Sequence, residues 1–157
     1  MKMDRTDRRI LEALQRNGRI TNLELADKIG LSPSPCSRRV KQLEDNGIID
    51  HAITLLDPAK LGLKLTAFVQ ISMDKHTPDR FENFESHVQG YPEVIECYLI
   101  TGHTADYQLK VMVPDMDYYQ EFLLGKLTRI EGVSGVQSSF VMKKAVDRKE
   151  LPLQHLH

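Results

Sequence analysis

Residues 31–44 read LSPSPCSRRVKQLE, and this stretch decides the fold of the first third of the chain. Ser32 is a residue type that caps helix N-termini, and Pro33 and Pro35 fit the first helical turn, where a missing N–H group loses no intrahelical partner. The prolines therefore start a helix here and do not break one.

This helix has two different faces. Cys36, Val40 and Leu43 recur at i, i+4 and i+7, which is typical of a buried apolar stripe. The residues that fall on the opposite side are Ser34, Ser37, Arg38 and Lys41. A basic, hydroxyl-bearing outer face at a sharply started helix indicates contact with the phosphates and base edges of duplex DNA.

Two earlier segments complete a three-helix core. Thr21 and Glu24 form the pattern of a capping box, and Gly30 ends the short helix that they begin. A longer helix is predicted for residues 4–17. Helix, glycine turn and second helix follow at the spacing of a helix-turn-helix, whose second helix enters a major groove roughly 12 Å wide. Residues 47–55 are expected to form a turn and a β wing.

Composition indicates a globular protein. Of 157 residues, 41% are hydrophobic and 27% charged, and no apolar run approaches the ~18 residues of a membrane span. The N-terminus lacks the apolar core of a signal peptide, so we expect a cytoplasmic protein that binds no membrane. Cys36 and Cys97 are expected to be reduced core residues. The net charge of −1 divides into +2 for residues 1–50 and −3 for residues 51–157, and so weak a basic excess suggests that DNA is bound by an oligomer.

The second part of the chain changes to strand periodicity after a Pro- and Gly-containing connector. The expected order is βαββαβ, with strands at 65–73, 94–101, 107–113 and 133–142 and helices opened by Thr77-Pro78 and by Asp115. This order predicts a ferredoxin-like sheet with both helices on one face, and hence an α+β protein. The predicted domains are residues 1–56, a linker at 57–62, and residues 63–157.

The other face of that sheet needs a cover. Phe68, Ile100, Met112 and Val141 fall on strands whose two sides are both partly apolar. A large apolar patch is seldom left in water, so we expect a second protomer to cover it. A two-fold dimer also presents two recognition helices about 34 Å apart.

The loop at Gly102 is the candidate small-molecule site. Gly102 permits close backbone approach, Asp106 can accept from an α-ammonium group, and Ser138 or Ser139 can hold a carboxylate. The alternative is structural: Gly102 allows a hairpin turn and Asp106 caps the next strand. The spacing of the histidines predicts no metal site, and no catalytic motif is present, so no enzymatic activity and no cofactor are expected.

Taken together, the chain from about residue 4 to 153 resembles the leucine-responsive regulatory protein (Lrp)/AsnC family of transcription regulators. The segments that carry the resemblance are residues 4–7, 17–22, 31–44, 101–102, 114–116 and 137–142. The resemblance implies a bacterial or archaeal, nucleoid-associated regulator that dimerises through its second domain, assembles into octamers, and responds to an amino acid. The family's effector motif is roughly Gly-x-x-Asp, whereas here three residues separate Gly102 from Asp106, so this loop is one residue longer than the family's.

The candidate site residues form two sets. The DNA-binding set is Thr21, Asn22, Ser32, Ser34, Ser37, Arg38, Arg39 and Lys41. The effector set is Tyr98, Thr101, Gly102, Asp106, Tyr107, Ser138 and Ser139. Within the first set Arg38 and Lys41 are the stronger DNA contacts, while Arg39 has the alternative role of buttressing the helix.

Two other functions remain open at this level. One is a DNA-organising protein of the same build that does not respond to a ligand. The other is an enzyme resembling the sirohaem decarboxylases, which share the fold; the intact basic helix argues against it.

Overall fold

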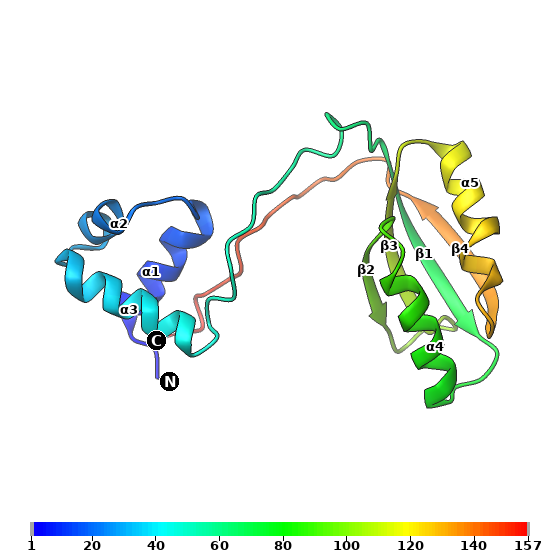
Figure 1. Cartoon of the computed structure of the whole chain (residues 1–157), viewed down its shortest axis with the longest axis horizontal. Coiled ribbons are helices and arrows are strands. Elements are labelled where there is room, and N and C mark those ends of the chain that lie inside the picture. The colour runs from blue at the N-terminus through cyan, green and yellow to red at the C-terminus, as the bar shows by residue number, and fades with distance from the viewer. Residues whose placement is uncertain (1, 157) are drawn as a thin grey trace. The chain divides into compact units, whose positions relative to one another are not determined.

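The computed structural model describes residues 2–156, which form two compact units (Figure 1). One unit contains the chain up to Leu55 together with the tail that begins at Ala145, and the other spans Leu56–Lys144. The boundary between Leu55 and Leu56 therefore lies next to the predicted linker at residues 57–62. The C-terminal tail, however, groups with the first unit, whereas the sequence analysis placed it in the second domain.

The first unit is a three-helix core. Its helices are α1 (Arg5–Arg16), α2 (Asn22–Ile29) and α3 (Pro33–Asp45). The Thr21–Glu24 capping box and the left-handed Gly30 (φ 74°) bound α2 as the sequence predicts. Ser32 is the N-cap residue of α3, but its side chain makes no capping hydrogen bond, so the prolines define this helix start.

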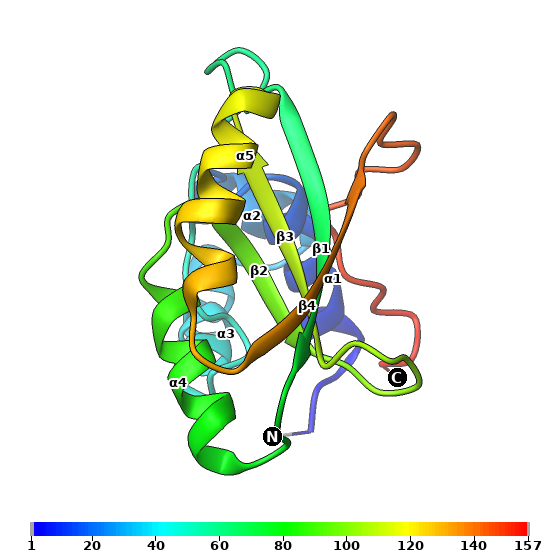
Figure 2. The ribbon, with the colours of Figure 1, turned by 90° about the vertical axis from the view of Figure 1, so that its right-hand side faces the viewer.

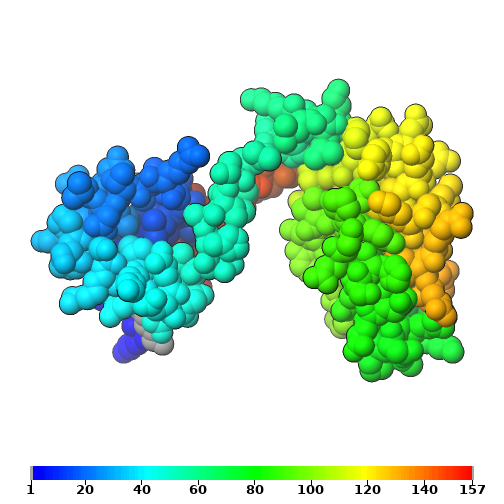
Figure 3. Space-filling model, in the orientation of Figure 1, coloured from blue at the N-terminus to red at the C-terminus, as the bar shows by residue number. Residues whose placement is uncertain are grey.

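The expected β wing is the main local difference. Residues 50–57, all within the described chain, contain no assigned strand and run extended. Figure 3 shows this stretch as a narrow run of atoms. An extended segment forms a β-ladder only when a second strand offers hydrogen bonds. The alternation of apolar residues predicted the wing, but the described chain contains no partner strand for it.

The second unit is a four-stranded antiparallel sheet in the order β2-β3-β1-β4. Its elements are β1 (Leu65–Met73), α4 (Pro78–Gln89), β2 (Val94–Leu99), β3 (Tyr107–Val113), α5 (Met116–Gly125), a 3₁₀ turn (Leu127–Arg129) and β4 (Val133–Phe140). Figure 2 shows both helices on one face of this sheet. The predicted βαββαβ order and the α+β class are thus confirmed.

Burial follows the alternation of the strands. Val69 and Ile71 of β1, with Leu109 of β3, face the helices and are fully buried against Phe84 of α4. No helix of the described residues covers the opposite face, and Phe68 on it is 37% exposed. The unit therefore has one dry core and one open sheet face.

Candidate nucleic-acid interface and ligand loop

The outer face of α3 presents four exposed polar side chains. Ser34, Ser37, Arg38 and Lys41 lie at i, i+3, i+4 and i+7, which places them on one side of the helix, and all four are exposed. The 13 residues of α3 span about 20 Å, long enough to follow a major groove. This face offers hydroxyl donors and two cations to DNA.

The N-terminus of α3 is fixed by α2. Asn22 Nδ2 donates to the Pro33 carbonyl oxygen at 2.9 Å, and Thr21 Oγ1 accepts from the Glu24 backbone N–H at 3.2 Å. Of the two predicted DNA contacts, Asn22 therefore joins α2 to the start of α3, whereas Thr21 caps α2 itself. Both residues are also exposed.

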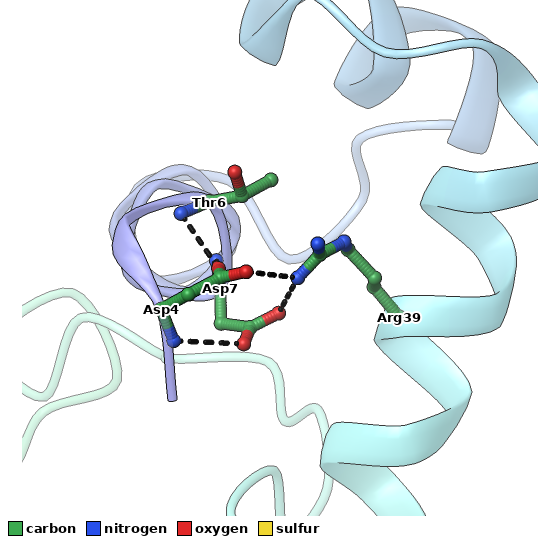
Figure 4. A network of polar contacts seen from close by, with 4 residues as sticks. All are labelled: Asp4, Thr6, Asp7 and Arg39. Carbon is green, nitrogen blue, oxygen red and sulfur yellow. Dashed lines mark hydrogen bonds and ion pairs between the residues drawn. The ribbon is translucent and has the colours of Figure 1, made fainter. Parts of the chain in front are cut away.

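Arg39 has a different environment from its neighbour Arg38. Its Nη1 donates to Asp4 Oδ2 at 2.9 Å and to Asp7 Oδ1 at 2.7 Å, so the guanidinium spans α3 and the start of α1 (Figure 4). Asp7 is buried and Arg39 is 30% exposed. The hydrogen bonds from Arg39 to Asp7 and Asp4 raise the pKa of this arginine. The sequence left two roles open for Arg39, a DNA contact and support of the helix, and this geometry favours support of the helix.

The same aspartates also begin α1. Asp4 accepts from the backbone N–H groups of Thr6 (2.8 Å) and Asp7 (2.9 Å), and Asp7 accepts from the Asp4 N–H at 3.1 Å. The backbone hydrogen bond from Asp7, assisted by Arg39, lowers the pKa of Asp4. Because the positive charge of Arg39 is neutralised here, Arg38 and Lys41 carry the outward charge of α3.

In the sheet unit, Asp106 is the centre of the candidate ligand loop. Its Oδ2 accepts from the Met73 backbone N–H at 2.7 Å, and its Oδ1 lies 2.8 Å from His76 Nε2. Its backbone N–H donates to Ile71 O at 2.8 Å, and its carbonyl accepts from Ile100 N at 2.9 Å. Asp106 thus joins the ends of β1 and β2, which is a structural role other than capping the next strand.

His76 was missed by sequence reasoning. It lies in the connection from β1 to α4, contacts Asp106 and packs its ring edge-on against Phe81 at 6.1 Å between centroids. A single histidine in a loop has no periodicity, and only the sheet topology brings it to Asp106. Gly102 begins the loop in the left-handed region (φ 85°), with open space where a Cβ would lie.

Thr101 lies in the bend after β2, next to Gly102, and the other effector candidates lie on two faces of the sheet. Tyr107 is buried under the helices and donates to Glu85 Oε1 at 2.7 Å, and the Ser138 hydroxyl bonds to the Tyr119 hydroxyl on the same side. Tyr98 pairs with Gln108 and Ser139 pairs with Phe68, and paired residues of neighbouring strands point to the same face of a sheet. Tyr98 and Ser139 therefore lie on the open face. Within one chain the structure therefore does not gather the predicted effector set into one pocket.

A groove of about 400 Å³ lies elsewhere on this unit, between α4 and β2, lined in part by Glu85, Cys97 and Tyr107. Burial, with the nearby Glu85 carboxylate, raises the pKa of Cys97 to about 11. Cys36 and Cys97 are both free thiols. Among the described residues there is no cluster of three His, Cys, Asp or Glu side chains suited to a metal, and no helix is long and apolar enough to cross a membrane.

Comparison with known proteins covers almost the whole chain. A family model described as winged helix-turn-helix DNA-binding matches residues 3–50, and one described as Lrp/AsnC ligand binding domain matches residues 66–151. The leucine-responsive regulatory protein of Klebsiella pneumoniae is 42% identical over 152 residues, which is 97% of this chain and 92% of that protein.

Solved structures agree with these matches. A transcriptional regulator of Neisseria meningitidis, solved in complex with L-methionine, has a TM-score of 0.95 at 44% identity and covers 99% of this chain and 100% of its own. AsnC of Escherichia coli has a TM-score of 0.87 at 30% identity, over 94% of this chain and 97% of its own. The helical unit and the sheet unit thus both have counterparts in proteins named as regulators.

Proposed function

This chain belongs to the Lrp/AsnC family of transcription regulators, and from that premise we propose that it binds specific DNA sequences through α3 under the control of an amino acid bound near the Gly102 loop. It is a regulator with a helix-turn-helix DNA-binding domain and a ligand-binding domain. The proposal concerns the residues involved, the ligand and the assembly. It places the protein in the cytoplasm of a bacterium or archaeon, at the nucleoid, without a catalytic step.

One observation supports the DNA interface most strongly. Of the three cations on α3, Arg39 is neutralised by two aspartates, whereas Arg38 and Lys41 are exposed on the same face as two serines. We assign Arg38 to a guanine edge, where a bidentate contact is worth about 1–3 kcal/mol, and Lys41 to a phosphate.

The test uses a duplex enriched from a random-sequence pool by the unmodified protein. Arg38→Ala should weaken binding by about 5- to 150-fold in fluorescence anisotropy at fixed salt, the fold-change that corresponds to that energy. Arg129→Ala is the matched control, because it removes an arginine from the sheet unit. Equal affinities for the unmodified protein and Arg38→Ala would contradict the assignment.

The proposed ligand is a free amino acid. The N. meningitidis relative was solved with L-methionine, and the loop here offers a left-handed glycine, exposed backbone and the Asp106 carboxylate. Both Asp106 oxygens already have partners, so the ammonium group must share or displace the His76 contact.

A second copy of the chain is part of this proposal. The open sheet face carries Phe68, Tyr98 and Met112, of which Phe68 is 37% and Tyr98 53% exposed. Covering this face by a second protomer removes apolar surface from water, and further pairing of dimers to an octamer allows several chains to contribute to one ligand site. Analytical ultracentrifugation tests this assembly.

Isothermal titration with each of the twenty amino acids tests ligand control. Gly102→Val should abolish binding while DNA affinity without ligand is retained. Gly62→Val is the control, because Gly62 has nearly the same φ (81°) and equally open space but lies in the connector. If no amino acid binds the unmodified protein, the ligand-insensitive DNA organiser is the better description, and the complete pairing of Asp106 within one chain favours that second candidate.

A further inference from the structure

The C-terminal tail returns to the DNA-binding unit after the sheet unit is complete. Residues 145–156 group with the three helices, so the sheet unit is an insertion between two segments of one unit. The tail contacts Arg8, Gln15 and Arg16 of α1, at i, i+7 and i+8.

The central contact is a two-point pairing between Gln15 and Leu151. Gln15 Nε2 donates to the Leu151 carbonyl at 3.2 Å, and the Leu151 N–H donates to Gln15 Oε1 at 2.6 Å. A glutamine side chain offers one donor group and one acceptor, so it satisfies both backbone groups of a single residue as a neighbouring strand does. This pairing fixes the register of the tail on α1.

Charge and apolar contacts flank this pairing. Glu150 Oε2 lies 3.1 Å from Arg16 Nε, and Arg8 Nη1 donates to the Leu156 carbonyl at 3.5 Å. Leu153 packs against the buried cluster of the helical unit, which includes Ile10 and Leu43. Leu153 therefore contributes to the same core that supports α3.

The sheet topology gives this docking a mechanical consequence. β1 begins and β4 ends side by side, since Ala67 pairs with Phe140 and Val141 N donates to Thr66 O at 2.9 Å. Both connections to the helical unit thus leave the sheet at the same end. The chain therefore joins the two units at two points that are adjacent on the sheet.

We propose that residues 150–156 are a strap that forms an integral part of the DNA-binding unit and gives the sheet unit a second mechanical connection to it. The strap is held by Gln15 and by the Leu153 side chain. Its loss loosens the core beneath α3 and leaves a single covalent connection between the two units.

Hydrogen–deuterium exchange on the full-length protein tests the docking directly. The Leu151 amide should exchange at least tenfold more slowly than an unstructured amide, and Gln15→Met should remove that protection while leaving β1 amides unchanged. Gln120→Met on α5 is the matched control, because this exposed glutamine lies in the sheet unit. An unprotected Leu151 amide in the unmodified protein would overturn the proposal.

A truncated chain that ends at Lys149 tests the role in DNA binding. It should unfold several degrees lower in its helical unit and bind the enriched duplex about three- to tenfold more weakly. Leu153→Ala should show part of both effects, so a single substitution checks the truncation. Unchanged melting and unchanged DNA affinity in both variants would show that the tail is not part of the DNA-binding unit.

A six-residue Gly-Ser insertion after Ala145 separates docking from connection. Leu151 protection and DNA affinity without ligand should be unchanged, while the effect of saturating L-methionine on DNA affinity should fall by at least half. This last expectation rests on the proposed amino-acid response. If methionine has no effect on DNA affinity in the unmodified protein, the proposed amino-acid response is wrong, but the exchange and truncation experiments still test whether the strap is docked. If the methionine effect is undiminished after the insertion, the strap does not act as a second mechanical connection between the units.

Discussion

Replacing Arg39 by methionine should damage folding more than DNA binding. The change keeps the length of the side chain but removes two hydrogen bonds, at 2.7 and 2.9 Å, from the carboxylates of Asp7 and Asp4. Asp7, only 3% exposed, then keeps the Asp4 backbone N–H as its remaining hydrogen-bond partner among the described residues.

The magnitude follows from burial. Breaking a fully buried ion pair costs about 3–5 kcal/mol, and a hydrogen bond to a charged group contributes about 1.5–3 kcal/mol. Arg39 is 30% exposed and the Asp4 side chain 53%, so solvent screens part of the interaction. We expect a loss of about 2 kcal/mol, which lowers the melting temperature of a unit this small by roughly 8–16 °C.

Arg38→Met is the matched comparison. Arg38 is exposed on the outer face of α3, so its loss should leave melting within about 1–2 °C, since surface substitutions rarely exceed ~0.5 kcal/mol, while DNA affinity falls. At 10 °C, where both variants are folded, Arg39→Met should bind the enriched duplex within about threefold of the unmodified protein. Normal melting with a large loss of DNA affinity in Arg39→Met would refute the assignment of Arg39 to the fold.

Three further predictions concern the sheet unit. Burial disfavours the charged form of Glu93, but hydrogen bonds from Lys126, from its own backbone and from Tyr118 together lower its pKa. The ionised Glu93 therefore stabilises the folded protein above its unfolded pKa near 4.5, and this stabilisation is lost as pH falls through the lower folded pKa. Urea unfolding between pH 3 and 7 should show Glu93→Gln less stable at pH 7 by about 2 kcal/mol, with the difference shrinking in acid; a pH-independent difference would contradict this. With its pKa near 11, against 9.0 for an ordinary thiol, Cys97 should react with iodoacetamide at pH 7.5 about a hundredfold more slowly in the folded protein than in urea, and equal rates would contradict its burial. Because the ammonium group competes with His76 for Asp106 Oδ1, His76→Ala should strengthen amino-acid binding about fivefold in calorimetry, whereas the adjacent exposed Lys75→Ala should not; equal effects would remove His76 from the site.

Local patterns predicted the regular elements well. Alternation of apolar residues gave β1 and β3 with the bounds that the structure has, because both are central strands with one buried face. β2 ends at Leu99 and not at the expected residue 101, because its partner strand β3 begins opposite it at Tyr107. Strand ends depend on the partner strand, which a single sequence segment does not contain.

The long-range polar contacts could not be predicted from the sequence. Arg39 meets Asp7 across 32 residues, and Gln15 meets Leu151 across 136, with no periodicity to connect either pair. The effector set was predicted from spacing and resemblance, and the faces of the sheet divide it because the side-chain direction reverses at every residue, so Ser138 and Ser139 point to opposite sides.

Thermodynamic reciprocity tests the central claim most directly. The dissociation constant for the enriched duplex is measured with and without saturating L-methionine, or whichever amino acid binds in calorimetry, and that for the amino acid with and without saturating duplex. Linkage requires both constants to change by one factor, which we expect to lie between about 5 and 150. A protein that holds no duplex at low salt, or whose DNA affinity is the same at every ligand concentration, would contradict the account.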